Sequence, residues 1–332
     1  MKYEDAVASQ PENLELTRTR VVEALAASDL SPWRTGTLGV VAMGAASHAG
    51  WALVECLRRA GRRATNLEAS ALLEDVRPSA FADSFVLVSE GGRSTETVGA
   101  ANRLDAGGRL GMTNVDDSPL AHAVDLTVTI GHGEDSPVYT VGYTATLQAF
   151  GLLADALGAA MPGERYGELP GELGRLLSEQ TDRMEEIAGL TSGLAAFDFV
   201  GHGASFASAS ESALLFREAT RIPTAAFETR QYLHGPMESL GPDRGCVVFG
   251  DRREVELGRY LAEQGIPVVL LTSVDVQKSR GLSVVRVPPA GPVSRAVLEI
   301  APVQLLAGSI ARIRGLAIDG FVYHQDDTKL PE

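Results

Sequence analysis

Apolar and polar positions follow two alternating patterns along the chain. Short runs of consecutive apolar residues, typical of strands buried on both faces, are followed by segments with apolar positions at helical spacing. Strands alternating with helices in this way predict parallel sheets with helices on both faces, an α/β fold. The runs predict strands at 37–43, 84–88, 109–114, 125–130, 197–201, 244–250, 266–272 and 283–287. The helical segments are 11–27, 48–61, 95–108, 137–158, 170–190, 204–220, 253–264 and 295–314, with Pro11 at the favoured first position of the first helix.

The two halves of the chain begin alike. VVAMGAASHAG (40–50) and DFVGHGASFAS (198–208) each place a glycine-containing turn between an apolar run and a helix. This repetition predicts that one doubly wound unit has been duplicated. The segment MPGERYGELPGE (161–172) is rich in proline, glycine and glutamate, and we place a domain boundary there. The predicted domains are 1–165 and 166–332.

One turn has the composition of an anion-binding loop. SEGGRSTET (89–97) surrounds a Gly–Gly pair with hydroxyl groups, directly after a predicted strand and before a predicted helix. Such loops lie at the carboxyl ends of parallel strands, where doubly wound sheets bind their ligands. Glu90 stands inside this loop, and a carboxylate repels phosphate. Arg93 offsets that charge if its guanidinium turns inward, whereas an Arg93 that faces solvent leaves the loop acidic.

Composition narrows the function classes. The 332 residues are 45% hydrophobic and 22% charged, as in soluble globular proteins, and the net charge is −14. A charge of this sign argues against nucleic acid and anionic membranes as partners. The first residues lack the apolar core of a signal peptide and no run of 18 apolar residues occurs, so we expect a cytoplasmic protein. Cys56 and Cys246 are expected to be buried free thiols.

Metal and dinucleotide sites are not expected. Apart from His234, the histidines, His48, His122, His132, His202 and His324, have no spacing typical of a metal site. GAASHAG (44–50) lacks the second and third glycines of a dinucleotide fingerprint. We therefore predict no metal and no cofactor. Lys2, Lys278 and Lys329 are the only lysines, so a Schiff-base mechanism has few candidates.

Two residues are candidates for acid–base chemistry. His234 precedes Gly235 and Pro236, in a turn that displays the imidazole for proton transfer, although a histidine that only caps a turn fits the same sequence. Glu218 ends an Ala/Ser/Leu-rich helix and lies seven residues after Glu211, on the same face. A helical glutamate is ordinarily a solvated surface residue. If this helix is buried, the pKa of Glu218 rises and its carboxyl becomes a usable proton carrier.

Taken together, these segments resemble the sugar isomerase (SIS) family. Within this family they resemble the tandem-SIS isomerase half of glucosamine-6-phosphate synthase and the related amino-sugar deaminases and deglycases. It implies two flavodoxin-like units, each with a five-stranded parallel sheet, commonly assembled as a homodimer. The matching segments are EDAVASQPENL (4–14), GAASHAG (44–50), SEGGRSTET (89–97), NVDDSPLAHAVD (114–125), SESALLFREATRIPTAAFETRQYLHGPM (210–237) and PVQLLAGSIARIRGLAID (302–319).

The resemblance assigns roles to individual residues. It implies that Glu218 moves the proton between the first two sugar carbons. It implies that His234 opens the sugar ring, reaching the site from the neighbouring subunit. Lys329 matches the family's C-terminal Schiff-base lysine only after a shift of about three residues. The implied substrate-binding residues are Gly44, Ala46, Ser47, Ser89, Glu90, Gly91, Gly92, Arg93, Ser94, Thr97 and Glu134.

The departures from the family pattern shape the expected function. Ala46 and Gly91 replace phosphate-binding serines, Glu90 replaces glutamine or arginine, and Leu215 replaces a lysine. The family's glutaminase domain is not in the sequence, so we expect no glutamine-dependent amide transfer. We expect an enzyme that isomerises, deaminates or deglycates a sugar or amino sugar, with or without a phosphate. The alternatives are a non-catalytic regulatory protein that binds a sugar or sugar phosphate, and a structural partner of an active homologue.

Overall fold

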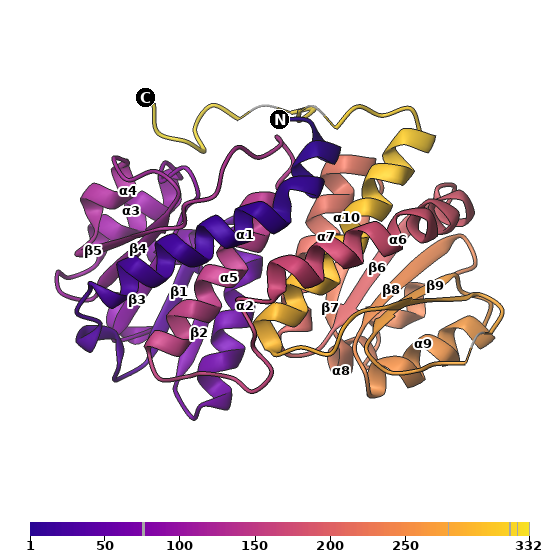
Figure 1. Cartoon of the computed structure of the whole chain (residues 1–332), viewed down its shortest axis with the longest axis horizontal. Helices are drawn as coiled ribbons and strands as arrows, with labels where there is room; N and C mark the ends of the chain where they lie inside the picture. The colour runs from indigo at the N-terminus through magenta and orange to yellow at the C-terminus, as the bar shows by residue number, and fades with distance from the viewer. Residues whose placement is uncertain (75–76, 278, 319, 324, 332) are drawn as a thin grey trace.

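Two parallel sheets of five strands form the framework of the protein (Figure 1). The computed structural model describes residues 1–74, 77–277, 279–318, 320–323 and 325–331. The strand orders are β2-β1-β3-β4-β5 and β10-β9-β8-β6-β7, which are the same order when the second sheet is read from β7. This is the flavodoxin-like order, so the predicted α/β fold of two equivalent units is confirmed. The strands are β1 (Leu38–Ala42), β2 (Ala64–Glu68), β3 (Ser84–Val88), β4 (Arg109–Thr113), β5 (Leu126–Thr129), β6 (Ala196–Gly201), β7 (Thr224–Glu228), β8 (Arg244–Phe249), β9 (Val268–Thr272) and β10 (Leu282–Arg286).

Helices cover the sheets and fill the space between them (Figure 1). Helix α10 packs on α6, α7 and α5, while α2 packs on α5 and α7, so helices from both halves meet. One apolar cluster accordingly contains residues of both halves, and the domain boundary near 165 remains a prediction. The helices are α1 (Tyr3–Ala26), α2 (Gly44–Arg59), α3 (Thr95–Arg103), α4 (Pro119–Ala123), α5 (Val141–Ala156), α6 (Leu169–Thr191), α7 (Ser205–Thr220), α8 (Thr229–Tyr232), α9 (Arg253–Glu263) and α10 (Pro292–Ile313).

The prediction that the first helix begins at Pro11 is wrong. Helix α1 begins at Tyr3, and Pro11 lies inside it. Proline has no N–H to donate to the carbonyl four residues earlier, which is that of Val7. The side-chain amide of Gln10 donates to the Val7 oxygen instead, at 2.9 Å, and so replaces the missing bond. The helix therefore continues through the proline.

Two strands have no counterpart in the predicted pattern. Strands β2 and β7 lie at an edge of the first and the second sheet. They are only partly buried, and β2 carries the polar residues Thr65 and Asn66. The apolar run that marks a central strand is absent from both for this reason. Each sheet thus gains the fifth strand that the family resemblance implies.

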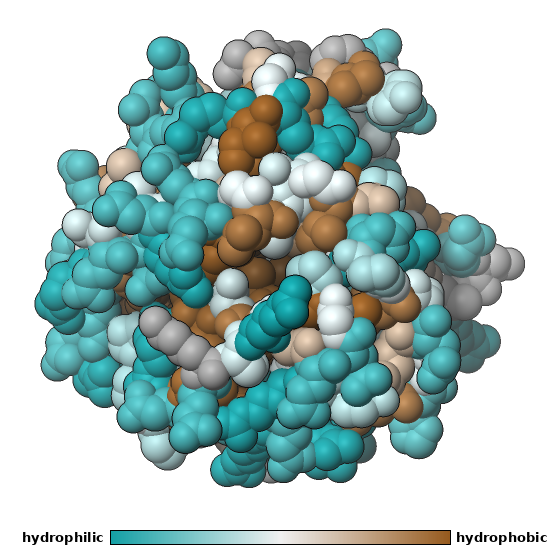
Figure 2. Space-filling model, turned by 90° about the vertical axis from the view of Figure 1, so that its right-hand side faces the viewer, coloured by the Kyte–Doolittle hydropathy of each residue, from teal (hydrophilic) through white to brown (hydrophobic). Residues whose placement is uncertain are grey.

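Burial accounts for the most apolar segment of the chain. Helix α10 is the one helix among the described residues that is long and apolar enough to cross a membrane, yet 83% of its apolar window is buried inside the protein. It therefore serves as a core helix. Cys56 and Cys246 are buried free thiols, as predicted. Seen from the right-hand side of Figure 1, the surface is largely hydrophilic at its rim, and apolar residues gather near its centre (Figure 2).

Candidate active site

Residues from both halves of the chain line a cavity of about 780 Å³. It lies at the carboxyl ends of the adjacent strands β1 and β3. The strand order reverses between these two strands, which is where doubly wound folds bind ligands. Its lining comes from the turn after β1, the loop after β3 with the start of α3, the segment before α5, α7 and the C-terminal tail. It includes the predicted residues Gly44, Ala46, Ser89, Glu90, Gly91, Arg93, Ser94, Thr97, Glu218 and Lys329.

Four predicted residues lie outside the lining of this cavity. Ser47 and Gly92 are buried, in α2 and in the loop after β3 respectively. The Glu134 carboxylate is 70% exposed and forms an ion pair with the N-terminal ammonium group. His234 is exposed and follows the short helix α8, and its backbone N–H donates to the Gln231 carbonyl at 3.1 Å. A single chain thus brings Glu218 to the cavity without His234.

The loop after β3 is held by its own hydroxyl groups. Ser94 precedes α3, and its Oγ accepts from the backbone N–H of Thr97 at 3.3 Å, a typical helix cap. The same Oγ accepts from the Thr97 hydroxyl at 3.1 Å and donates to the Glu96 carboxylate at 3.1 Å. The backbone N–H of Ser94 donates to Ser89 Oγ at 3.2 Å. The hydroxyl groups that suggested an anion site therefore stabilise the loop itself.

The two glycines of this loop differ in their surroundings. Gly92 has φ +64°, and a Cβ there would lie 2.1 Å from Ser118 Oγ. Position 92 therefore requires glycine. A Cβ at Gly91 would have no heavy atom within 4 Å, so a side chain would fit there. The absence of a hydroxyl at position 91 is not imposed by packing.

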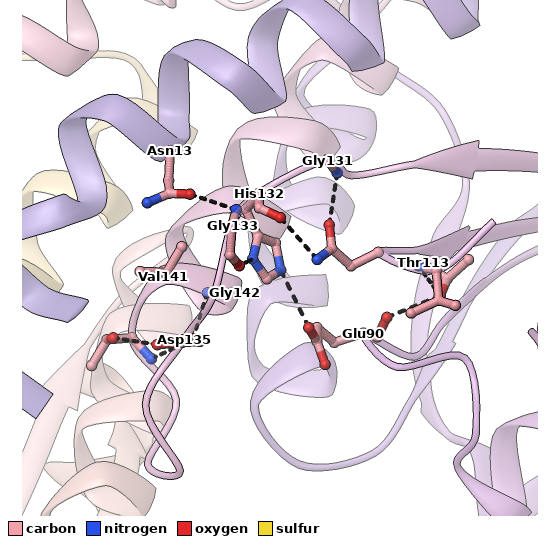
Figure 3. Close-up of polar contacts among 12 residues, drawn as sticks. Asn13, Glu90, Thr113, Gly131, His132, Gly133, Asp135, Val141 and Gly142 are labelled. Carbon is pink, nitrogen blue, oxygen red and sulfur yellow. Dashed lines mark hydrogen bonds and ion pairs between the residues drawn. The ribbon is translucent and has the colours of Figure 1, made fainter. Parts of the chain in front are cut away.

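Glu90 is fixed from two sides (Figure 3). Its backbone carbonyl accepts from Thr113 Oγ1 at 2.9 Å and from the N–H of Asn114 at 2.7 Å. Its carboxylate Oε1 lies 3.5 Å from Nε2 of His132, whose side chain is fully buried, while 33% of the Glu90 side chain is exposed. The other ring nitrogen of His132, Nδ1, lies 2.8 Å from the Gly133 carbonyl, which can only accept, so Nδ1 carries a proton.

The segment that carries His132 is itself anchored (Figure 3). Asn114, which follows β4, donates from Nδ2 to the His132 carbonyl at 3.0 Å and accepts at Oδ1 from the N–H of Gly131 at 2.8 Å. The N–H of Gly133 donates to Asn13 of α1 at 2.6 Å. His132 is therefore a preorganised support behind Glu90. Sequence patterns do not reveal this pair, because Glu90 and His132 are far apart along the chain.

Glu218 is a carboxyl group with a raised pKa in the cavity lining. Burial raises its pKa to about 7, and the charge of Glu211 adds to the rise, while Arg221 and Arg217 lower it in part. Glu211, one of its neighbours on α7, is buried and lies 2.9 Å from Nδ1 of His48 on α2. Burial raises the pKa of Glu211 above its ordinary value, although the bond to His48 opposes this. The Glu211–His48 contact joins the two halves of the chain.

Lys329 reaches the cavity because the C-terminal tail pairs with the loop after β3. Ser94 and Lys329 form an antiparallel β-bridge. Next to it, the Leu330 N–H donates to the Arg93 carbonyl at 2.8 Å. The Arg93 guanidinium in turn donates from Nε to the Leu330 carbonyl at 2.9 Å, with a second bond from Nη2. The sequence allowed an Arg93 that turns inward or faces solvent; in the structure its guanidinium is directed at the C-terminal tail.

Leu215 stands where the family pattern has a helix lysine. Leu215 is buried in the core, while its neighbour Leu214 lines the cavity. Lys329 is thus the lysine of the lining.

Among the described residues, no group of three or more His, Cys, Asp or Glu side chains is placed to hold a metal ion. His324 lies outside the described residues.

Comparison with known proteins identifies the fold. The structure superposes on glucosamine-6-phosphate deaminase from Thermotoga maritima with a TM-score of 0.78 and 21% identity, covering 98% of both chains. Tagatose-6-phosphate ketose/aldose isomerase from Escherichia coli gives a TM-score of 0.79 with 15% identity, covering 98% of this chain and 96% of that one. The chain has the tandem SIS fold. No family model matches the sequence.

Sequence comparison leads to the same relatives. The chain is 28% identical over 256 residues to the isomerising glutamine–fructose-6-phosphate aminotransferase of Pseudomonas putida, covering 71% of this chain and 42% of that protein. The C-terminal domain of the corresponding Francisella tularensis enzyme superposes with a TM-score of 0.78 and 18% identity, over 96% of this chain and 97% of that one. The chain is therefore a homologue of the SIS isomerase part of these enzymes. It spans about two fifths of the length of the curated relatives.

Proposed function

We propose that this SIS protein is an enzyme that transfers a proton on a sugar or amino sugar, with Glu218 as its acid–base group. The observation that carries the proposal is the location of Glu218, whose pKa is about 7, in the wall of a cavity of about 780 Å³. A carboxyl group of this pKa can accept and return a proton near neutral pH, and such groups typically accelerate reactions about 10²–10⁴-fold. The likeness to sugar-phosphate isomerases and a deaminase supports this class of reaction.

The proposed chemistry balances without an oxidant or a metal. Glu218 removes a proton from carbon 2 of the open-chain sugar, the electrons form an enediol or enolamine, and the proton returns to carbon 1. For deamination of a 2-amino aldose the same transfer leaves an imine at carbon 2. For deglycation of a 1-amino ketose the transfer runs the other way, from carbon 1 to carbon 2, and leaves an imine at carbon 1. In both cases water adds to the imine carbon, the carbon–nitrogen bond breaks, and the amine leaves with the protons that water supplies. Lys329, which lines the same cavity, can carry the ketose carbonyl as a Schiff base, with release of water, or polarise it as an ammonium group.

We further propose that the active form is a cytoplasmic homodimer in which His234 serves the cavity of the partner subunit. His234 is exposed and outside the cavity lining of its own chain, which supports this arrangement. Mixing Glu218→Gln and His234→Ala subunits should then restore activity. Half of the randomly mixed dimers would contain one intact and one doubly altered site, giving about a quarter of the wild-type rate. No recovery after verified subunit exchange would place both residues in one subunit's site, and full activity of His234→Ala by itself would remove His234 from the reaction.

The proposed function is tested by turnover. The wild-type protein, Glu218→Gln and Glu256→Gln should be assayed for isomerisation and amine release on a panel of free and phosphorylated aldoses, ketoses and amino sugars. Glu256 is an exposed residue of α9 and provides the control. We expect a loss of at least about 100-fold in Glu218→Gln and none in Glu256→Gln. Sugar binding without turnover by the wild-type protein would instead favour a regulatory sugar-binding protein.

A further inference from the structure

The loop after β3 presents a carboxylate where a phosphate-binding loop needs donors. Glu90 Oε1 is directed at the buried His132 ring, at 3.5 Å, and the carboxylate remains partly exposed in the cavity lining (Figure 3). A carboxylate offers only acceptors, whatever the protonation state of the ring behind it. Position 90 therefore selects for a ligand group that donates hydrogen bonds.

The other groups of the cavity supply little positive charge for a phosphate. Glu90, Glu96 and Glu218 line it, against Arg93 and Lys329. The Arg93 guanidinium is engaged by the Leu330 carbonyl, so part of its donor capacity serves the tail. The loop hydroxyls are likewise bonded within the loop. A phosphate would enter an environment in which repulsion from carboxylates competes with few available donors.

The buried side chains of His132 and Tyr139 lie next to Glu90. Nε2 of His132 faces the Glu90 carboxylate at 3.5 Å, and the Tyr139 hydroxyl interacts with the charge of Glu90 but makes no hydrogen bond of good geometry to a described residue. Tyr139 lines the cavity, and burial raises the pKa of its hydroxyl well above the ordinary value, with the charges of Glu90 and Asp135 adding to the rise. The hydroxyl therefore stays protonated. Buried polar groups are rarely left without a well-formed hydrogen bond, so the Tyr139 hydroxyl indicates a polar ligand group beside Glu90.

We propose that Glu90, supported by His132, binds a hydroxyl or ammonium group of an unphosphorylated amino sugar where a related site would hold a phosphate. The inference rests on the proposed function, because it names the substrate class of the same cavity. Glu90 is the residue that determines specificity, and His132 positions it. Gly91, which has open space around it, leaves room for such a ligand.

The test compares binding of D-glucosamine and D-glucosamine 6-phosphate by calorimetry at fixed pH and salt. We expect the wild-type protein to bind glucosamine at least about tenfold more tightly, and Glu90→Gln to remove this preference. Glu96→Gln removes the same unit of charge from the same lining and should change the preference less. The double variant Glu90→Gln/Gly91→Ser adds a hydroxyl donor and should bind the phosphorylated sugar at least about tenfold better than the wild-type protein. A gain of binding cannot result from misfolding.

Several outcomes would overturn the inference. These are a wild-type preference for the phosphorylated sugar, an unchanged preference in Glu90→Gln, an equal change in Glu96→Gln, or no binding of either sugar. The proposed function has a separate readout, because it depends on the loss of turnover in Glu218→Gln. Turnover that requires Glu218 but prefers phosphorylated sugars would leave the proposed function in place and refute this assignment of Glu90.

Discussion

Replacing Glu218 by glutamine should stabilise the folded protein at high pH and have little effect at low pH. The pKa of Glu218 rises from an ordinary value of 4.5 to about 7, chiefly because the carboxyl is buried and secondly because Glu211 lies near it. Between these values the unfolded chain releases a proton that the folded protein retains. The ionisation of Glu218 therefore favours unfolding as the pH rises.

The size of this effect follows from the shift. Below pH 4.5 both states are protonated and Glu218 carries no ionisation cost; the cost grows between pH 4.5 and 7 and is complete above pH 7. At about 1.36 kcal/mol per pKa unit, the shift corresponds to about 3–4 kcal/mol. Because the side chain is partly exposed, solvent screening reduces this to about 2–3 kcal/mol. Glutamine has no charge, so the variant avoids the cost.

Thermal unfolding at pH 5 and pH 8.5 measures the difference in stability between Glu218→Gln and the wild-type protein. With about 2.1 cal/mol/K of unfolding entropy per residue, 2–3 kcal/mol shifts the Tm of a chain of this length by about 3–4 °C. We expect Glu218→Gln to exceed the wild-type Tm by this amount at pH 8.5 and by about 1 °C at pH 5. The exposed Glu256→Gln should show the same small difference at both values. A Glu218→Gln difference that does not depend on pH, or a loss of stability at pH 8.5, would refute the reasoning.

Two further predictions concern the loop after β3 and the tail. Gly92→Ala should lower the stability by about 1–3 kcal/mol because of its positive φ and the approach to Ser118, whereas Gly91→Ala should change it by less than about 0.5 kcal/mol; equal Tm shifts would contradict the geometry. Arg93→Ala removes the donors to the Leu330 carbonyl, so limited proteolysis should cut the tail several-fold faster, and an unchanged rate would show that the tail is held by other contacts.

Much of the fold could be predicted because its central strands are short apolar runs. The strands around 38–42, 84–88 and 268–272 are fully buried and gave clear signals. The edge strands 64–68 and 224–228 gave none, because partial burial permits polar residues. The predicted helix start at Pro11 was wrong because the hydrogen bond from the Gln10 side chain to the Val7 carbonyl allows the helix to pass through the proline.

Those parts of the candidate site that lie within one segment of the sequence could be predicted. The loop 89–97 and Glu218 were found from local composition and from the family resemblance. The support of Glu90 by His132 could not be predicted from the sequence. It depends on how the loops after β3, β4 and β5 meet through Asn114. The approach of Lys329 likewise depends on the β-bridge to Ser94, which sequence spacing does not encode.

The central claim is that Glu218 moves a proton on a sugar carbon. The most direct measurement incubates the protein with free and phosphorylated amino sugars and ketoses in D₂O and follows deuterium at carbons 1 and 2 by NMR. We predict exchange at these carbons with the wild-type protein and at least about 100-fold slower exchange with Glu218→Gln. Equal exchange rates in both proteins, or no exchange with any sugar that binds, would contradict the claim.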